Sequence, residues 1–167
     1  MRFPFLAAVL ALAACTPTLN WREVRAEPTP LTVLLPCKPD RGTRTVPLGG
    51  RDTPLNMLGC DAGGATFAVA FADLGDAAQA APVLAQWRAA TLANMRAGAS
   101  TGQAFVLAGG GMQGERVTAA GQRADGSAVQ SQALYFAQGA RVFQAVIYAD
   151  RLTGEMADTF FGGLRLP

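Results

Sequence analysis

The chain has 167 residues, enough for one domain of ordinary size, and it carries 14 basic and 12 acidic side chains. Its formal net charge of +2 is too small to gather nucleic acid or an acidic substrate from a distance. The chain contains no histidine, which excludes mechanisms that depend on a histidine base or a histidine metal ligand.

The N-terminus has the pattern of a secretory signal peptide. Arg2 precedes an apolar run over residues 3–12, and the small residues Ala13 and Ala14 come directly before Cys15. The run is far shorter than the roughly 20 residues that a membrane-spanning helix needs. We therefore predict that residues 1–14 are a signal peptide, which is removed during export.

The sequence Leu-Ala-Ala-Cys that ends at Cys15 resembles the bacterial lipobox, in which the cysteine thiol receives diacylglycerol before cleavage. The alternative is an ordinary signal-peptidase site with an unmodified cysteine nearby, but Cys15 would then have no explanation. The resemblance implies lipidation of Cys15 and a membrane anchor that leaves the domain facing the periplasm. An aspartate directly after the cysteine would resemble a signal for retention in the inner membrane. Thr16 stands at this position instead, so we expect the protein to be anchored in the outer membrane.

Cys37 and Cys60 then remain as an even pair in an exported chain. In an oxidising compartment, this parity predicts a disulfide between them. The sequence has no C-x-x-C spacing and no calcium-loop pattern, so it predicts no metal site and no cofactor.

The mature chain divides into a short N-terminal segment and one domain. Residues 15–30 are predicted to be the lipidated N-terminus and a short spacer, in which prolines flank a brief strand around Trp21. Residues 31–167 are predicted to form the folded domain. Its strands are expected, from alternating or continuous apolar runs bounded by turn residues, at residues 31–35, 44–48, 55–60, 65–72, 115–123, 127–137 and 140–149.

Two segments have helical periodicity. Apolar residues over 82–97, Trp87 among them, fall on one half of a helical wheel, and Trp87 is expected in the core. A short helix over 153–161 has Thr153 as its predicted N-cap. The order of these elements predicts an α+β fold, with a largely antiparallel sheet of about six to seven strands flanked by one long and one short helix.

Four segments together resemble the PsbP-like fold, which is named after an extrinsic subunit of photosystem II and shared with many small bacterial lipoproteins. These segments are the strand before Pro36, the alternating strand before the long helix, the strand at residues 142–148, and the ending over residues 160–166 with its pair of phenylalanines. The resemblance covers nearly all of the mature chain. It implies a binding or assembly role and brings no catalytic residues with it.

No residue combination in the sequence predicts catalysis. The glycine-rich stretch over residues 109–116 has Glu115 where a phosphate loop has lysine, and a carboxylate there would repel phosphate. The serines have no base beside them, and the only lysine is Lys38. Capping and solvation explain the closest acidic pairs, which are Asp73 with Asp76 and Glu155 with Asp158.

Two features leave alternatives open. Trp21 could pack on the sheet or lie at the membrane interface. A basic cluster lies around the hairpin that the strands at 44–48 and 55–60 are expected to form. It is predicted to be solvated, although it could touch anionic lipid headgroups, and it consists of Lys38, Arg41, Arg44 and Arg51.

The sequence therefore predicts an envelope lipoprotein that is not an enzyme. We expect it to bind an unidentified envelope protein or to support envelope assembly, with its lipid in the membrane and no nucleic acid as partner. The alternative is a periplasmic carrier of a small apolar ligand, held between the sheet and the long helix.

Overall fold

The computed structural model describes residues 18–167, so the predicted signal peptide and Cys15 lie outside the described residues. The two α-helices are α1 (Ala80–Asn94), preceded by a 3-10 turn at Ala77–Gln79, and α2 (Gly154–Gly162). The strands are β1 (Arg22–Arg25), β2 (Thr32–Leu35), β3 (Asp40–Leu48), β4 (Arg51–Ala62), β5 (Ala65–Asp73), β6 (Ser100–Val106), β7 (Ala108–Gly109), β8 (Gln113–Gln122), β9 (Ala128–Gln138), β10 (Arg141–Ala149) and β11 (Arg165–Leu166).

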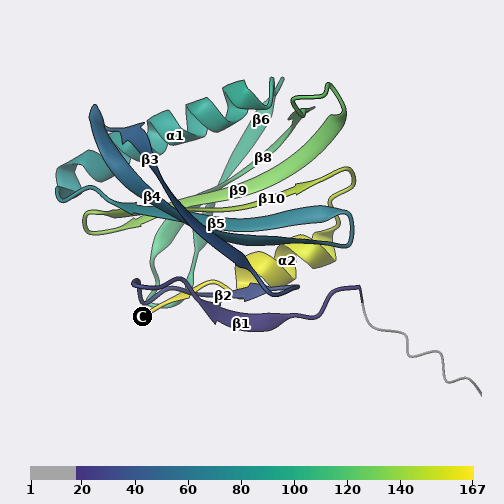
Figure 1. The fold of residues 1–167 in the computed structure, drawn as a ribbon, viewed down its shortest axis with the longest axis horizontal. Coiled ribbons are helices and arrows are strands. Elements are labelled where there is room, and N and C mark those ends of the chain that lie inside the picture. Colours follow the sequence, from purple (N-terminus) through teal and green to yellow (C-terminus); the bar gives the residue numbers. More distant parts are fainter. Residues whose placement is uncertain (1–17) are drawn as a thin grey trace, which may run out of the picture.

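Seven strands form the main sheet in the order β3-β4-β5-β10-β9-β8-β6, and all neighbours in it are antiparallel. The helix α1 crosses one face of this sheet, over β9 and β10, while α2 lies on the other face (Figure 1). The predicted α+β class, with one antiparallel sheet, one long helix and one short helix, is therefore confirmed. We call the side of the sheet that α1 covers the α1 face.

The strand pairing of β5 with β10 fixes which residues enter which layer. Phe67 pairs with Ile147 and Phe71 with Phe143, and all four side chains point away from α1 into the larger core. Aromatic rings fill that core: Phe136 stacks on Phe143 at a centroid distance of 4.8 Å. On the opposite face β5 presents alanines, as its alternating sequence predicted, so that α1 can approach the sheet closely.

A second, small sheet closes the larger core from below, in the order β1-β2-β11-β7 (Figure 1). The sequence did not predict this sheet. Residues assigned to the spacer belong to it, because β1 pairs with β2 along its whole length and Ala26 and Thr29 are buried. The packed domain therefore begins before residue 31, the boundary that the sequence suggested.

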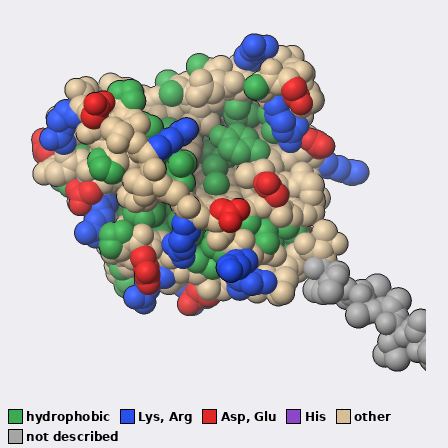
Figure 2. Space-filling model, viewed as in Figure 1, with side chains coloured by type: hydrophobic (Ala, Val, Ile, Leu, Met, Phe, Trp, Pro, Cys, Tyr) green, Lys and Arg blue, Asp and Glu red, His purple; other side chains and the backbone are tan. Residues whose placement is uncertain are grey.

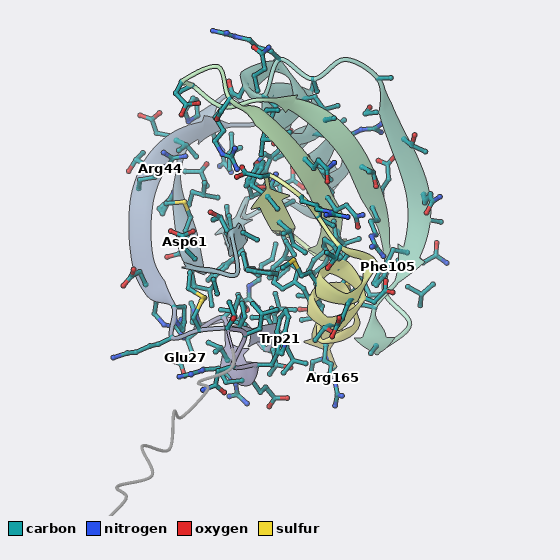
Figure 3. The ribbon with its side chains drawn as sticks, turned by 90° about the vertical axis from the view of Figure 1, so that its right-hand side faces the viewer. Trp21, Glu27, Arg44, Asp61, Phe105 and Arg165 are labelled. Carbon is teal, nitrogen blue, oxygen red and sulfur yellow. A yellow bond between two sulfur atoms is a disulfide. The ribbon has the colours of Figure 1, made fainter. Side chains whose placement is uncertain are left out.

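Trp21 lies on the small-sheet side, near α2 (Figure 3). The centroids of its ring and of the Phe67 ring are 5.5 Å apart, in a T-shaped arrangement. Of the two alternatives for Trp21, packing within the domain or lying at the membrane interface, the structure therefore shows packing within the domain. The edge strand β6 was also missed, because four consecutive exposed residues give it no hydrophobic alternation. It is held by its pairing with β8.

The helix boundaries differ slightly from those predicted. The helix α1 begins at Ala80 and ends at Asn94, whereas the periodic segment ran over residues 82–97, and Arg96 takes a positive φ of 48° just beyond the helix. Thr153 caps α2 as predicted, since its hydroxyl accepts a hydrogen bond from the Met156 N–H at 3.3 Å. Within residues 18–167 no helix has the length and apolar character needed to cross a bilayer.

Cys37 and Cys60 form a disulfide, as cysteine parity predicted. Cys37 lies just after β2 of the small sheet, and Cys60 lies in β4 of the main sheet. The bond therefore joins the two sheets covalently, across a sequence separation of 23 residues.

We predict that replacing both Cys37 and Cys60 with serine lowers the free energy of unfolding by about 3 kcal/mol, because the unfolded chain regains the entropy of an open loop. Urea denaturation of the variant and of the oxidised wild type measures the difference. The same urea midpoint for both proteins would contradict the prediction, and wild type treated with a reductant should behave like the variant.

Candidate functional site

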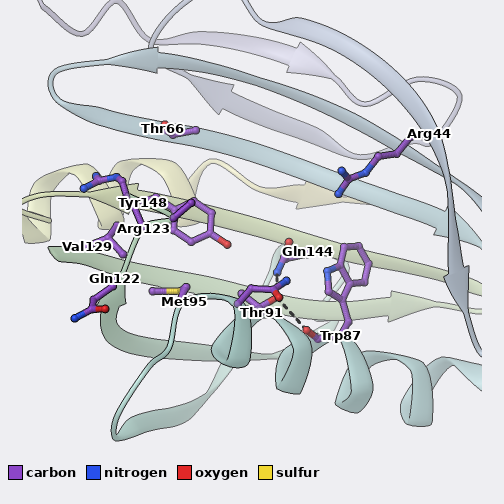
Figure 4. A pocket seen from close by; sticks show the side chains of 12 residues that line it. Arg44, Thr66, Trp87, Thr91, Met95, Gln122, Arg123, Val129, Gln144 and Tyr148 are labelled. Atoms are coloured by element: carbon purple, nitrogen blue, oxygen red, sulfur yellow. Dashed lines mark hydrogen bonds between the residues drawn. The ribbon is translucent and has the colours of Figure 1, made fainter. Parts of the chain in front are cut away.

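A pocket of about 460 Å³ opens between α1 and the main sheet (Figure 4). Figure 2 shows a hollow on the face viewed there, with hydrophobic side chains in its floor and basic side chains on either side. Polar side chains gather around this space, and its walls include Arg44, Thr66, Trp87, Gln144 and Tyr148.

Strand alternation aims the sheet residues into this space. Gln144 and Tyr148 lie on β10 in the positions that alternate with the buried Phe143 and Ile147, so they point to the α1 face. Thr66 on β5 is the cross-strand partner of Tyr148. From α1, Trp87 and Thr91 lie one turn apart and face the strands.

A buried hydrogen-bond network attaches α1 to the sheet at the floor of the pocket. The amide nitrogen of Gln144 donates to the Thr91 hydroxyl and to the Tyr135 hydroxyl, both at 3.0 Å. The Thr91 hydroxyl in turn donates to the Trp87 carbonyl at 2.9 Å. Gln144 is only 6% exposed, so these bonds satisfy donors that would otherwise be buried without a partner.

Two charged side chains line the pocket, and both are arginines. Arg44 extends from β3 into the space (Figure 4), and among residues 18–167 no hydrogen bond or ion pair engages its guanidinium group. Arg123, at the other end, is held by Asp150 at 2.7 Å and by the Ala128 carbonyl at 2.8 Å. No described acidic side chain lines the pocket, although Asp61 lies in an adjoining hollow and accepts a hydrogen bond from Thr66 at 2.5 Å.

The two tyrosines near the pocket stay neutral well above physiological pH. Burial raises the pKa of Tyr148 to about 12, and the charge of ionised Tyr135 adds to the shift. Burial also raises the pKa of Tyr135, against the opposing effect of its hydrogen bonds to Thr91 and Gln144. Near neutral pH, both hydroxyls are therefore hydrogen-bond donors rather than nucleophiles.

Beside this pocket, a more apolar groove of about 510 Å³ runs along the other side of α1, between Leu84 and Leu92 on the helix and Tyr135 on β9. Arg88 and Glu115 bridge it with an ion pair in which both carboxylate oxygens accept, at 2.7 Å and 2.9 Å. Glu115, the residue that argued against a phosphate loop, thus lies in strand β8 and pairs with the helix.

The acidic residues that the sequence singled out do not converge. Asp73 accepts a hydrogen bond from the Gly75 N–H, and Asp76 accepts one from the Ala78 N–H at the start of the 3-10 turn, both at 2.9 Å. Glu155 lies in the first turn of α2, and Asp158 lies 3.9 Å from Arg116. Within the described residues, no three Cys, Asp or Glu side chains come together as metal ligands.

The basic cluster of the first hairpin separates in space. Arg41 donates to the Arg25 carbonyl at 3.0 Å and Arg51 donates to the Leu74 carbonyl, whereas Arg44 points into the pocket. Trp87, which was expected in the core, is only partly buried and forms a wall of the pocket. The sequence thus named two pocket residues, but for other roles.

Sequence reasoning missed the site itself. The polar residue Gln144 inside the otherwise apolar strand 142–149 is the one signal that could have pointed to it. In the sequence, Tyr148 and Thr66 are ordinary alternating positions of two predicted strands, and nothing marks them as pocket residues.

Comparison with known proteins gives little further information. No protein-family model matches the chain, and no curated protein matches it. Among solved structures, the chain is similar to a Pseudomonas aeruginosa protein of unknown function described as a putative regulator, with 14% identity and a TM-score of 0.36 over 77% of this chain and 82% of that one. A likeness this distant carries no argument about function.

We predict that Gln144→Leu lowers the free energy of unfolding by about 1–3 kcal/mol, because the hydroxyls of Thr91 and Tyr135 lose their donor while remaining buried. Urea denaturation measures the change. Gln122→Leu is the matched control, since Gln122 also lines the pocket but is exposed, and it should shift stability by less than about 0.5 kcal/mol. Equal effects of the two substitutions would contradict the network.

The raised pKa of Tyr148 predicts a fall in stability at high pH. The unfolded chain loses this phenolic proton near the ordinary value of 10.0, whereas the folded chain keeps it to about 12. The stabilisation is therefore complete below pH 10 and is lost as the pH rises toward 12. Tyr148→Phe should reduce the slope of unfolding free energy against pH in this window. An unchanged slope would contradict the raised pKa of Tyr148. Tyr135 is present in both proteins, so its own titration contributes equally to the two slopes.

Proposed function

We propose that this chain is a lipoprotein of the bacterial envelope, anchored through Cys15 in the outer membrane, which acts by binding a partner protein and not by catalysis. The lipobox-like sequence before Cys15 and the absence of aspartate after it support the anchor and its location. A PsbP-like domain is part of the proposal, and the α+β arrangement is compatible with it.

The observation that carries the proposal is the composition of the α1-face pocket. Its charged and polar groups are suited to holding a ligand, namely an arginine without a partner among the described residues, a neutral phenol and an amide. None of its lining residues is a cysteine, serine or carboxylate that could serve as nucleophile or general base near neutral pH. A site with binding groups and no reactive pair favours recognition over chemistry.

A carrier of a small apolar ligand is the second candidate, and the apolar groove along Leu84 and Leu92 is what favours it. That groove is open, as the α1-face pocket is, whereas sites for small apolar ligands are typically enclosed. Between the sheet and α1, where a carrier would hold its ligand, the other pocket is lined by Arg44, Arg123 and Gln144, which suit a ligand with polar groups better than an apolar one. Partner binding is therefore the function that the geometry supports better.

Metabolic labelling with a fatty-acid analogue tests the anchor. The wild-type chain should be labelled and recovered with the outer membrane, and Cys15→Ser should be unlabelled because it has no thiol to alkylate. Equal labelling of both proteins would reject the lipoprotein proposal, and recovery with the inner membrane would reject the sorting argument.

Photo-crosslinking in intact cells tests the binding surface. A crosslinking residue at the exposed position Asn94, beside the pocket, should capture one discrete partner, whereas the same residue at Glu155 on α2 should not. Capture from Glu155 alone, or no capture from either position, would reject partner binding through the α1 face.

A further inference from the structure

We propose that the α1-face pocket binds a carboxylate group on Arg44, with the apolar part of the same ligand lying against Trp87 and Tyr148. This inference rests on the proposed function and names the chemistry that its site recognises. The carboxylate can belong to a free organic acid or to a chain end or acidic side chain of the partner protein, since the chemistry of recognition is shared.

The charged side chains of the pocket favour an anionic ligand. Arg44 and Arg123 line the pocket, and no acidic side chain among the described residues does. Arg123 is already paired with Asp150, whereas the guanidinium group of Arg44 has no hydrogen bond or ion pair within residues 18–167. A guanidinium group offers a fork of N–H donors that matches the two oxygens of a carboxylate. Arg44 is therefore the group that is free to take an anion.

The position of Arg44 carries the second step. On β3 it pairs with Leu55, which lies in the core beneath α1, so Arg44 is on the same face of the sheet as that helix. Figure 4 shows its guanidinium group extending toward the space above Trp87 and Gln144. Arg41, three residues earlier on the same strand, pairs with Leu58 of the other core and binds the Arg25 carbonyl. The strand therefore directs one arginine into the pocket and the other away from it.

The remaining walls define the rest of the ligand. The partly buried Trp87 supplies apolar surface, and the neutral Tyr148 hydroxyl supplies a hydrogen-bond donor. A phosphate is typically held by several converging donors, often backbone N–H groups at a helix N-terminus. No residue from the first turn of α1 lines this pocket, and the one guanidinium group in it without a partner among residues 18–167 is that of Arg44. One guanidinium group beside an aromatic wall fits a planar carboxylate with an apolar body.

The two tryptophans of the chain allow a direct test, because Trp87 lines the pocket and Trp21 packs against Phe67 on the other side of the sheet. The full-length protein, labelled with nitrogen-15 and purified in detergent, is titrated with indole-3-acetate and, separately, with its neutral amide. A second pair of probes is a tripeptide that ends in phenylalanine, with a free or an amidated C-terminus. The indole N–H signals of Trp87 and Trp21 are followed by NMR.

We expect an acid to shift the Trp87 signal at millimolar concentration and to leave Trp21 unchanged, and we expect its neutral amide to bind at least about tenfold more weakly. Arg44→Gln should weaken binding of the acid to a similar degree, because it removes the charged donors. Arg41→Gln removes the same charge from the same strand on the opposite face, and it should bind like the wild type. Stronger binding of the peptide acid identifies a partner chain as the source, and stronger binding of indole-3-acetate identifies a free organic acid.

Equal binding of acid and amide, equal affinity of wild type and Arg44→Gln, or no shift of Trp87 with either acid would each overturn the inference. Arg44 is exposed, so its replacement should leave the remaining NMR signals in place, and this spectrum is the check on folding. If crosslinking from Asn94 still captures a partner while the acids fail to bind, partner binding stands and only the carboxylate inference falls.

Discussion

The register between β5 and β10 is the constraint on which the rest of the structure depends. Both strands lie in the middle of the main sheet, and both of their faces are covered, one by α1 and the other by α2 and the small sheet. Because side chains alternate with a period of two, a slip of one residue would turn Phe143 toward α1 and Gln144 into the aromatic core. The hydrogen bonds of Gln144 to Thr91 and Tyr135 and the stacking of Phe143 on Phe136 both need these two side chains on their present faces, so a slip of one residue would disrupt both.

The two faces are packed with side chains of very different size. Phenylalanines fill the space toward α2, whereas alanines on β5 and Ala133 on β9 let α1 lie close to the sheet. The helix ends at Asn94, and the polar side chains of the pocket gather beside its C-terminal half. Gln144 is held against Thr91 of the helix, Tyr148 is only partly buried, and the pocket is the open space beside these two side chains. The helix α1, packed on a surface of small residues, thus leaves room for a site beside its C-terminal half.

Sequence periodicity could predict the parts of the fold that depend on buried alternation, and it failed where that signal is absent. Clear local patterns predicted the strand around Phe67, the strand around Phe143 and the helix capped by Thr153. All three elements are present in the structure. The edge strand β6 is polar and exposed, so it has no local pattern to read. The small sheet was missed because β2 pairs with β11, which is distant in sequence, although the segment of β2 was itself predicted as a strand. The pocket was missed for the same reason, since Arg44, Trp87 and Gln144 come from three elements whose relative placement only the tertiary fold supplies. The disulfide was predicted from redox chemistry rather than from geometry.

The small sheet also has a consequence for the order of folding. Its strand β11 pairs with β2, so two segments near opposite ends of the described chain must meet before this layer is complete. Such contacts form late, because the entropy of closing a long loop is lost before any packing compensates for it. The disulfide between Cys37 and Cys60 shortens that search, since it keeps β2 beside the main sheet while the C-terminal strand is still unpaired. In an oxidising compartment, the bond therefore guides assembly of the layer as well as stabilising the finished domain.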